Sequence, residues 1–175
     1  MSDIYTCPAE GISQLLIEAF DLNGVLRAEP DVTEIRIAAN PSPSPAGPEI
    51  VVEGDVARFA GFPAARVVLP YHVAVTVVDA RGDLRIEGLA AAARLETVEG
   101  DLRIDQVAGP VSISLVRGDV RADGAADLQI DACEGDCRFV AGGQLRLGVV
   151  EGDLRVTSAG DVHVTRIHGD AAIEK

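Results

Sequence analysis

The stretch that decides the fold is VEGDLRIDQVAGPVSISLVRGDVRA, residues 98–122. It contains the same pattern twice: a glycine and an aspartate are followed by two apolar residues with an arginine between them. The two glycines, Gly100 and Gly118, are 18 residues apart. Apolar residues at alternate positions are typical of a β-strand with one buried face. The stretch therefore predicts short strands that repeat at a fixed interval.

The Gly-Asp pair recurs through the second half of the chain with spacings of 18, 18, 17, 17 and 17 residues. The six pairs are Gly82-Asp83, Gly100-Asp101, Gly118-Asp119, Gly135-Asp136, Gly152-Asp153 and Gly169-Asp170. A second alternating segment precedes each pair, with apolar residues seven, five and two places before the glycine. Each repeat is therefore predicted to be two strands joined by a turn, and repeats of fixed length stack on one another.

These repeats predict an all-β, single-domain parallel β-solenoid over residues 1–175, with about eight rungs of 17–18 residues. A crossover between parallel strands of one sheet is right-handed in about 98% of cases, which favours a right-handed coil. A left-handed hexapeptide helix has turns of similar length, but it needs a small or apolar residue at every sixth place. Counting from Leu84 reaches Ala90 and then Glu96, which breaks that rule.

The regular repeats occupy residues 66–175, whereas residues 1–65 fit the template loosely and are predicted to form irregular rungs or a cap. Two further turns are expected within residues 22–27 (LNGVLR) and 52–56 (VEGDV). The prolines of residues 40–48, NPSPSPAGP, cannot donate backbone hydrogen bonds, so this stretch is predicted to be an exposed loop rather than an interdomain linker. Residues 12–20 fit either a strand or a helix that caps the coil, and the turn that follows favours the strand.

Glycine and aspartate have structural reasons to recur at the turn. Glycine permits a sharp reversal, often with positive φ, and an aspartate beside it can accept hydrogen bonds from nearby backbone amides. The third residue after the glycine is an arginine in five repeats: Arg85, Arg103, Arg121, Arg138 and Arg155. We expect these arginines and the turn aspartates to lie along adjacent edges, where opposite charges offset the repulsion between stacked like residues.

The composition argues against several classes of function. The net charge is −13 and only 3% of the residues are aromatic, so phosphate backbones would be repelled and nucleic acid is not expected as a partner. The chain starts without a basic and then apolar leader and has no run of 18 apolar residues. We therefore expect no direct membrane insertion and, for the chain as given, a cytoplasmic protein, with association to the cell surface left open.

Few residues suggest chemistry. Cys7, Cys133 and Cys137 form no CxxC pair, and we expect buried reduced thiols that act as small hydrophobes rather than a disulfide, a zinc site or a redox switch. No GxSxG, HExxH, P-loop or GxGxxG segment occurs, and no catalytic residue or cofactor is expected. The three histidines (His72, His163 and His168) are expected on the surface. The turn aspartates could offer oxygen ligands to Ca²⁺, but the glycine-rich calcium repeat is absent, so calcium is not expected.

The Leu69-Pro70 step, the V-x-V strands and the G-D-[LV]-R-[IV] turns resemble the DUF4097 family of β-strand repeat proteins, also called adhesin-like or toastrack domains. The similarity extends over nearly the whole chain and is strongest from Arg66 to Asp170. The family's usual turn is Ser-Gly-Asp, whereas here Glu, Arg or His precedes the glycine. The resemblance implies a non-catalytic module, often of bacterial envelope-stress or surface systems. Bactofilins, which are cytoskeletal β-helices, are similar in architecture only.

We therefore expect a non-enzymatic scaffold or protein-interaction module that assembles through the ends or faces of the solenoid, as a homo-oligomer or with a protein partner. The alternative is an adhesin-like or envelope-stress sensory domain that recognises a protein partner. In both cases the candidate interaction surface is the arginine row, defined as Arg85, Arg103, Arg121, Arg138 and Arg155.

Overall fold

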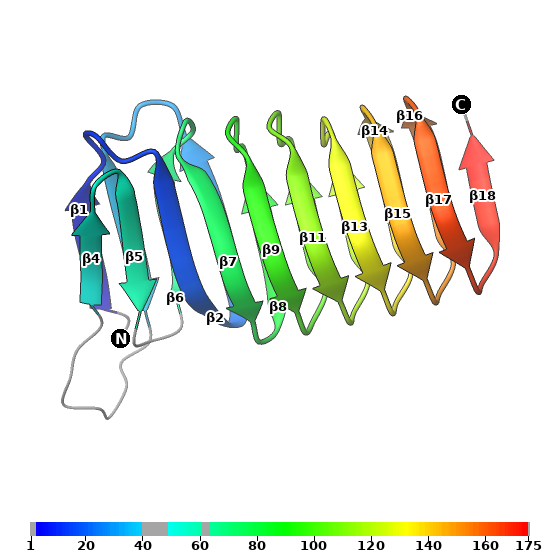
Figure 1. Ribbon diagram of the computed structural model, residues 1–175, viewed down its shortest axis with the longest axis horizontal. Coiled ribbons are helices and arrows are strands. Elements are labelled where there is room, and N and C mark those ends of the chain that lie inside the picture. Colours follow the sequence, from blue (N-terminus) through cyan, green and yellow to red (C-terminus); the bar gives the residue numbers. More distant parts are fainter. Residues whose placement is uncertain (1–2, 40–48, 61–63, 175) are drawn as a thin grey trace.

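A computed structural model of the chain describes residues 3–39, 49–60 and 64–174, and all of its regular elements are β-strands (Figure 1). The strands are β1 (Asp3–Pro8), β2 (Gln14–Glu29), β3 (Glu34–Ala39), β4 (Glu49–Glu53), β5 (Val56–Ala60), β6 (Ala64–Pro70), β7 (Ala74–Ala80), β8 (Asp83–Glu87), β9 (Ala93–Val98), β10 (Leu102–Asp105), β11 (Val111–Val116), β12 (Val120–Asp123), β13 (Leu128–Cys133), β14 (Cys137–Gly142), β15 (Leu145–Val150), β16 (Leu154–Ala159), β17 (Val162–Ile167) and β18 (Ala171–Glu174).

The strands form a flattened coil of two facing sheets. The near sheet of Figure 1 contains, in spatial order, β4, β5, the first half of β2, β7, β9, β11, β13, β15 and β17. The far sheet contains β1, β3, β6, the second half of β2, β8, β10, β12, β14, β16 and β18. From β5 onward in space, the parallel near strands run downward in Figure 1 and the parallel far strands run upward, while successive rungs advance to the right, so the coil is right-handed as predicted.

The predicted register is confirmed. Leu102 pairs in parallel with Leu84 on one side and with Val120 on the other. Eight parallel rungs result, and in spatial order they are β5–β6, β2, β7–β8, β9–β10, β11–β12, β13–β14, β15–β16 and β17–β18. Each inner rung has backbone hydrogen-bond partners on both sides, which is how a repeat too small to fold alone becomes stable.

The core is a thin aliphatic column between the two sheets. On β10, for example, Leu102 and Ile104 are buried while Arg103 between them is exposed. Among the described residues, every side chain in the buried class is apolar. Full burial of each such aliphatic side chain contributes about 1.5–3 kcal/mol, so the alternation that identified the strands also supplies most of the stabilisation.

Strand β2 departs from the predicted order of rungs. It is a single strand that lies between the β5–β6 rung and the β7–β8 rung, although both of these follow it in the sequence. The strand expected for residues 12–20 is confirmed from Gln14 onward. The turn predicted within residues 22–27 is wrong in register: Asn23 pairs with Asp83 and Gly24 with Leu84. The shift is two residues, so the inward and outward faces are preserved.

Gly24 therefore has a packing role rather than a turn role. A Cβ atom at Gly24 would lie 2.6 Å from a ring carbon of Phe20. Phe20 pairs with Ala80, two places before the turn glycine Gly82, while Gly24 pairs with Leu84, two places after it. The large ring at one position is accommodated because its partner across the corner has no side chain.

The turn predicted within residues 52–56 is confirmed at Gly54–Asp55, but it joins two antiparallel strands rather than the two strands of a rung. β4 and β5 form an antiparallel hairpin, with Gly54 at φ +64°, as a two-residue hairpin loop requires. The sequence held a sign of this, because Arg58 would occupy an inward position of the repeat template. In the structure Ala57 and Phe59 are buried instead, and Arg58 is exposed.

Antiparallel strands close the N-terminal end of the coil. β3 runs antiparallel to both β6 and β1 on the far sheet, and β4 runs antiparallel to β5 on the near sheet. The irregular N-terminal region predicted for residues 1–65 is thus a mixture of two rungs and a cap. The proline-rich loop predicted for residues 40–48 lies outside the described residues.

The turn glycines are needed for a different reason from the one predicted. Positive φ occurs at Gly11, Gly54, Gly88 and Gly124, none of which belongs to the six repeated Gly-Asp pairs. At Gly118 an added Cβ would instead lie 2.6 Å from the carbonyl carbon of Gly100 and in contact with the Asp101 carboxylate. Close stacking of successive turns, rather than an unusual backbone angle, excludes a side chain there.

Candidate interaction surface

The arginine row lies along one line of the far sheet. Arg103 pairs with Arg85 and with Arg121, and Arg138 pairs with Arg121 and with Arg155. All five side chains are exposed. The structure therefore brings the five predicted site residues together, one per strand at a spacing of about 4.8 Å.

Arg66 extends this line and was missed from the sequence. It pairs with Val25, which in turn pairs with Arg85, so it lies two strands beyond the arginine row. The place of Arg66 could not be predicted because it depends on the position of β2. Residues 66 and 85 align only when β2 is placed between their strands. Sequence spacing alone gives no indication of that insertion.

The two ends of the arginine row differ in charge pairing. Arg85 lies 3.1 Å from the Asp105 carboxylate, and Arg103 lies 2.8 Å from the same group. Within the described ranges, no acidic group approaches within 4.0 Å of Arg121, Arg138 or Arg155. Val140 and Thr157 stand where the earlier strands carry Asp105 and Asp123. The C-terminal half of the arginine row therefore presents cations that remain available to an external anion.

The turn aspartates do not neutralise the arginine row as predicted. Instead, an Oδ1 of each accepts a hydrogen bond from the backbone amide of the next aspartate in the stack. The N–H groups of Asp101, Asp119, Asp136, Asp153 and Asp170 donate at 2.8–2.9 Å. The aspartate column is therefore a ladder that ties successive rungs together, and this confirms the predicted bonding to backbone amides while placing the donor in the neighbouring rung.

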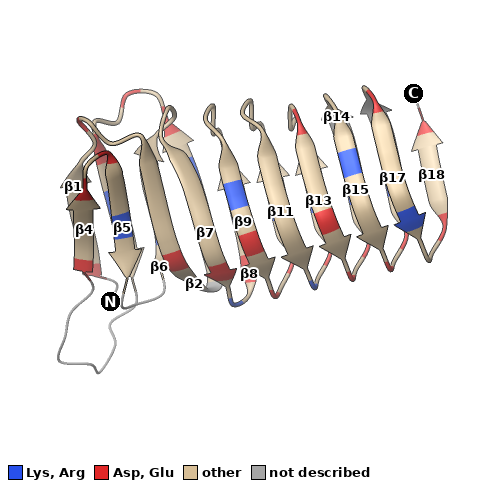
Figure 2. Cartoon of the chain, in the orientation of Figure 1, with Lys and Arg blue, Asp and Glu red and all other residues tan. Residues whose placement is uncertain are grey.

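The three histidines are exposed, as predicted, and the His168 Nδ1 atom lies 3.1 Å from the Glu151 carboxylate. His72 lies in the loop before β7, His163 on the near sheet and His168 at the last turn. The described part of the chain contains no group of three or more His, Cys, Asp or Glu side chains that could hold a metal ion. Figure 2 shows charged positions of both signs scattered over the near sheet.

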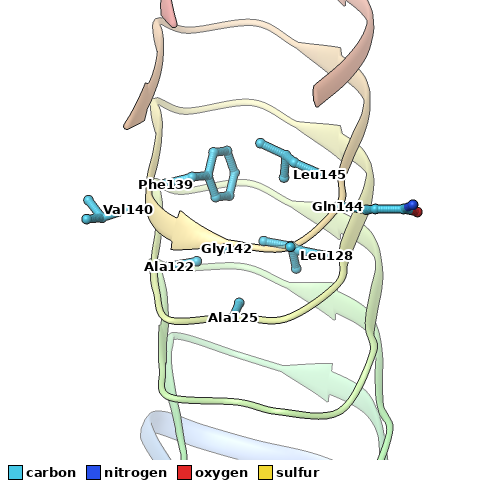
Figure 3. Close-up of a pocket in the computed structure, with 9 residues that line it drawn as sticks. Ala122, Ala125, Leu128, Phe139, Val140, Gly142, Gln144 and Leu145 are labelled. Atoms are coloured by element: carbon cyan, nitrogen blue, oxygen red, sulfur yellow. The ribbon is translucent and has the colours of Figure 1, made fainter. Parts of the chain in front are cut away.

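A small hollow between the two sheets is a packing defect. It has a volume of about 20 Å³ and lies at the corner opposite the Gly-Asp turns. Figure 3 shows Leu128, Phe139 and Leu145 pointing into it, while Gln144 and Val140 point away. The space is barely larger than the roughly 10–15 Å³ that one water needs, and its inward lining is apolar. It has the size and chemistry of a void between rungs rather than of a ligand site.

The rung β17–β18 is the last that the structure describes, and no described strand covers its outer edges. Within the described residues, β17 pairs only with β15 and β18 only with β16. Inward positions that are buried in the preceding rungs become accessible here: Ile173 is 47% exposed, whereas Val156, directly beneath it, is 0% exposed. We call the outer edges of β17 and β18, with their inward side chains, the open end.

Comparisons with known proteins identify no family for the chain. No family model and no curated protein matches the sequence. A solved structure that is similar along its whole length is that of a "putative cell adhesion protein" from Clostridium sporogenes. It shares 8% sequence identity with a TM-score of 0.45, over 99% of this chain and 98% of the other.

Among the described residues there is no helix with the length and hydrophobicity to cross a lipid bilayer.

Proposed function

We propose that the protein is a non-enzymatic scaffold that associates with further copies of itself through the open end. The observation that supports this is the exposure of core positions at β17–β18, together with the unpaired backbone groups of two sheet edges. Unprotected edges add strands from another chain unless charge, proline or a cap blocks them. The N-terminal end has such protection, because β1 carries Pro8 and antiparallel strands cover the β5–β6 rung.

The test compares two exposed isoleucines at opposite ends. Ile173 is 47% exposed on β18 and Ile4 is 70% exposed on β1. We expect the wild-type protein to form dimers or larger species in a concentration series followed by light scattering, and Ile173→Lys to return it to a monomer. The matched control, Ile4→Lys, should leave association intact.

The outcomes separate two modes of assembly. Loss of association only in the Ile173 variant identifies a closed pair joined at the open ends, whereas loss in both variants identifies a head-to-tail filament. A wild-type protein that stays monomeric at every concentration overturns the proposal.

The arginine row supports a second candidate function, an adhesin-like or envelope-stress sensory domain that recognises a protein partner with an acidic surface. The observation in favour is a set of three exposed cations, Arg121, Arg138 and Arg155, that have no acidic group within 4.0 Å among the described residues. We expect Arg121→Glu combined with Arg138→Glu to abolish capture of that partner in a pull-down. Arg94→Glu combined with Arg146→Glu, both on the near sheet, is the matched control because it changes the net charge by the same amount. Equal loss in the control variant would mean that only net charge matters.

A further inference from the structure

The rung β13–β14 differs from the rungs around it at the two core positions that flank its turn. Cys133 lies two places before Gly135, and Cys137 lies two places after it. The rungs on either side have aliphatic residues there: Val116 and Val120 before, Val150 and Leu154 after. Both cysteines are buried, at 1% exposure each.

Side chains at these two positions meet across the corner of the coil. The β2 rung shows this independently, because the Phe20 ring fills the space where a Gly24 side chain would lie. Cys133 and Cys137 occupy the corresponding positions of the β13–β14 rung, so both side chains lie at one corner of the core. The Cys133 sulfur also lies 3.4 Å from the carbonyl oxygen of Gly135 and 3.6 Å from that of Gly118.

This placement makes the two thiols unequal. A hydrogen bond from the Cys137 thiol lowers the pKa of Cys133, because it stabilises the thiolate. The same hydrogen bond, together with burial, raises the pKa of Cys137. Cys133 is therefore the first of the pair to ionise, and the thiolate is the nucleophilic form of cysteine.

We propose that Cys133 and Cys137 form a redox-active dithiol that hydrogen peroxide converts into an intramolecular disulfide. A disulfide needs its sulfurs about 2.05 Å apart, and these two side chains project into the same corner of one rung, on either side of a single turn. The site does not depend on self-association or on the arginine row.

The chemistry balances with one equivalent of peroxide. The Cys133 thiolate attacks one oxygen of hydrogen peroxide, the O–O bond breaks, and the departing hydroxide takes up a proton as water. The resulting sulfenic acid is attacked by the Cys137 sulfur. The new S–S bond forms as the S–O bond breaks, and the Cys137 proton leaves with the hydroxide as a second water. Two thiols and one peroxide thus give one disulfide and two waters.

The third cysteine provides an internal control. Cys7 is also buried, but it lies on β1, and its thiol donates a hydrogen bond to the carbonyl oxygen of Pro8 at 3.4 Å. No second thiol is recorded near it. If burial alone determined the reaction with peroxide, all three cysteines would react alike. A dithiol would instead make only the β13–β14 pair form a disulfide.

The experiment is peptide mass analysis after treatment of the folded protein with dilute hydrogen peroxide. Trypsin cleaves after Arg121 and Arg138, so residues 122–138 carry both cysteines in one peptide, without Cys7. We expect this peptide to lose two hydrogen atoms and to regain them with dithiothreitol. Free thiols per chain should fall from three to one. Cys133→Val and Cys137→Leu match the next rung, should fold, and should each abolish the shift, whereas Cys7→Ala should retain it.

Three results would overturn the proposal. The first is oxidation of the peptide to sulfinic or sulfonic acid without loss of two hydrogens. The second is a disulfide between chains, visible as a dimer on a non-reducing gel. The third is an unchanged peptide under conditions in which the Cys7 thiol reacts. If a variant fails to fold, the measurement on the wild-type peptide still decides.

Discussion

At the scale of single residues, the hydrogen bonds of the aspartate ladder all run in one direction, from the backbone amide of one rung to the carboxylate of the rung before it. Each carboxylate accepts the amide N–H of the aspartate in the next rung, such as Asp136 N–H to Asp119 at 2.8 Å. Carboxylates accept stronger hydrogen bonds than neutral groups do, although exposure to water reduces the net gain. The ladder therefore stabilises one stacking register at every turn.

A substitution in this ladder should have a measurable effect. We expect Asp119→Ala to lower the free energy of unfolding by about 1 kcal/mol, because the Asp136 amide loses a charged acceptor. Asp119→Asn retains an oxygen acceptor at the same place and should lose less. Urea denaturation of the two variants checks this, and equal losses would mean that the hydrogen bond is not the relevant interaction.

Gln106 gives the second residue-scale prediction. Its φ of 52° lies in the left-handed region, in the corner where Gly88 and Gly124 have φ of 72° and 68°. For a residue with a Cβ this conformation costs about 1–2 kcal/mol, partly offset by the freedom that glycine gains on unfolding. We expect Gln106→Gly to raise the thermal midpoint slightly and Gln106→Ala to give no gain. A lower midpoint for the glycine variant would show that the Gln106 side chain makes a compensating contact.

At the scale of the strand, alternation determines which substitutions matter. On β10, Ile104 is fully buried and its neighbour Arg103 is exposed. We expect Ile104→Ala to reduce stability by about 2–5 kcal/mol through lost contacts and a residual cavity. Arg103→Ala should cost about 0–1 kcal/mol, as is usual for exposed ion pairs. Chemical denaturation of both variants tests the assignment of faces, and similar losses would contradict it.

The same alternation explains what the sequence alone could predict. The 17–18-residue interval and the inward positions are local properties, so the register of β7 to β18 and the arginine row could be predicted. The insertion of β2 between two later rungs depends on contacts distant in sequence, and it has no local signature. Arg58 did indicate the β4–β5 hairpin, because the repeat template would have placed this charged residue at an inward position. The acidic partners of the arginines and the amide partners of the turn aspartates could not be predicted. They depend on how far side chains reach from one rung to the next, which sequence spacing does not specify.

At the scale of the whole molecule, the free energy of unfolding should be roughly a sum of contributions from single rungs and their contacts, since each rung contacts mainly its neighbours. We expect a chain that stops after Gly160 to remain folded, because β15–β16 and the rungs before it keep their own core. Its new end would present Leu145, Leu147, Leu154 and Val156, which are buried in the full chain. This end is more apolar than β17–β18, so the shortened protein should associate at lower concentration. Circular dichroism and sedimentation test the two halves of this prediction, and an unfolded product would mean that β17–β18 is required for the fold.

The place of β2 among the rungs also bears on how the protein is made. A ribosome releases residues 14–29 well before residues 56–87, and the latter supply every neighbour that β2 has in the coil. The newborn chain therefore cannot wind up from its first residues in the order of synthesis. Strand β2 gains its native neighbours only after those later segments have emerged.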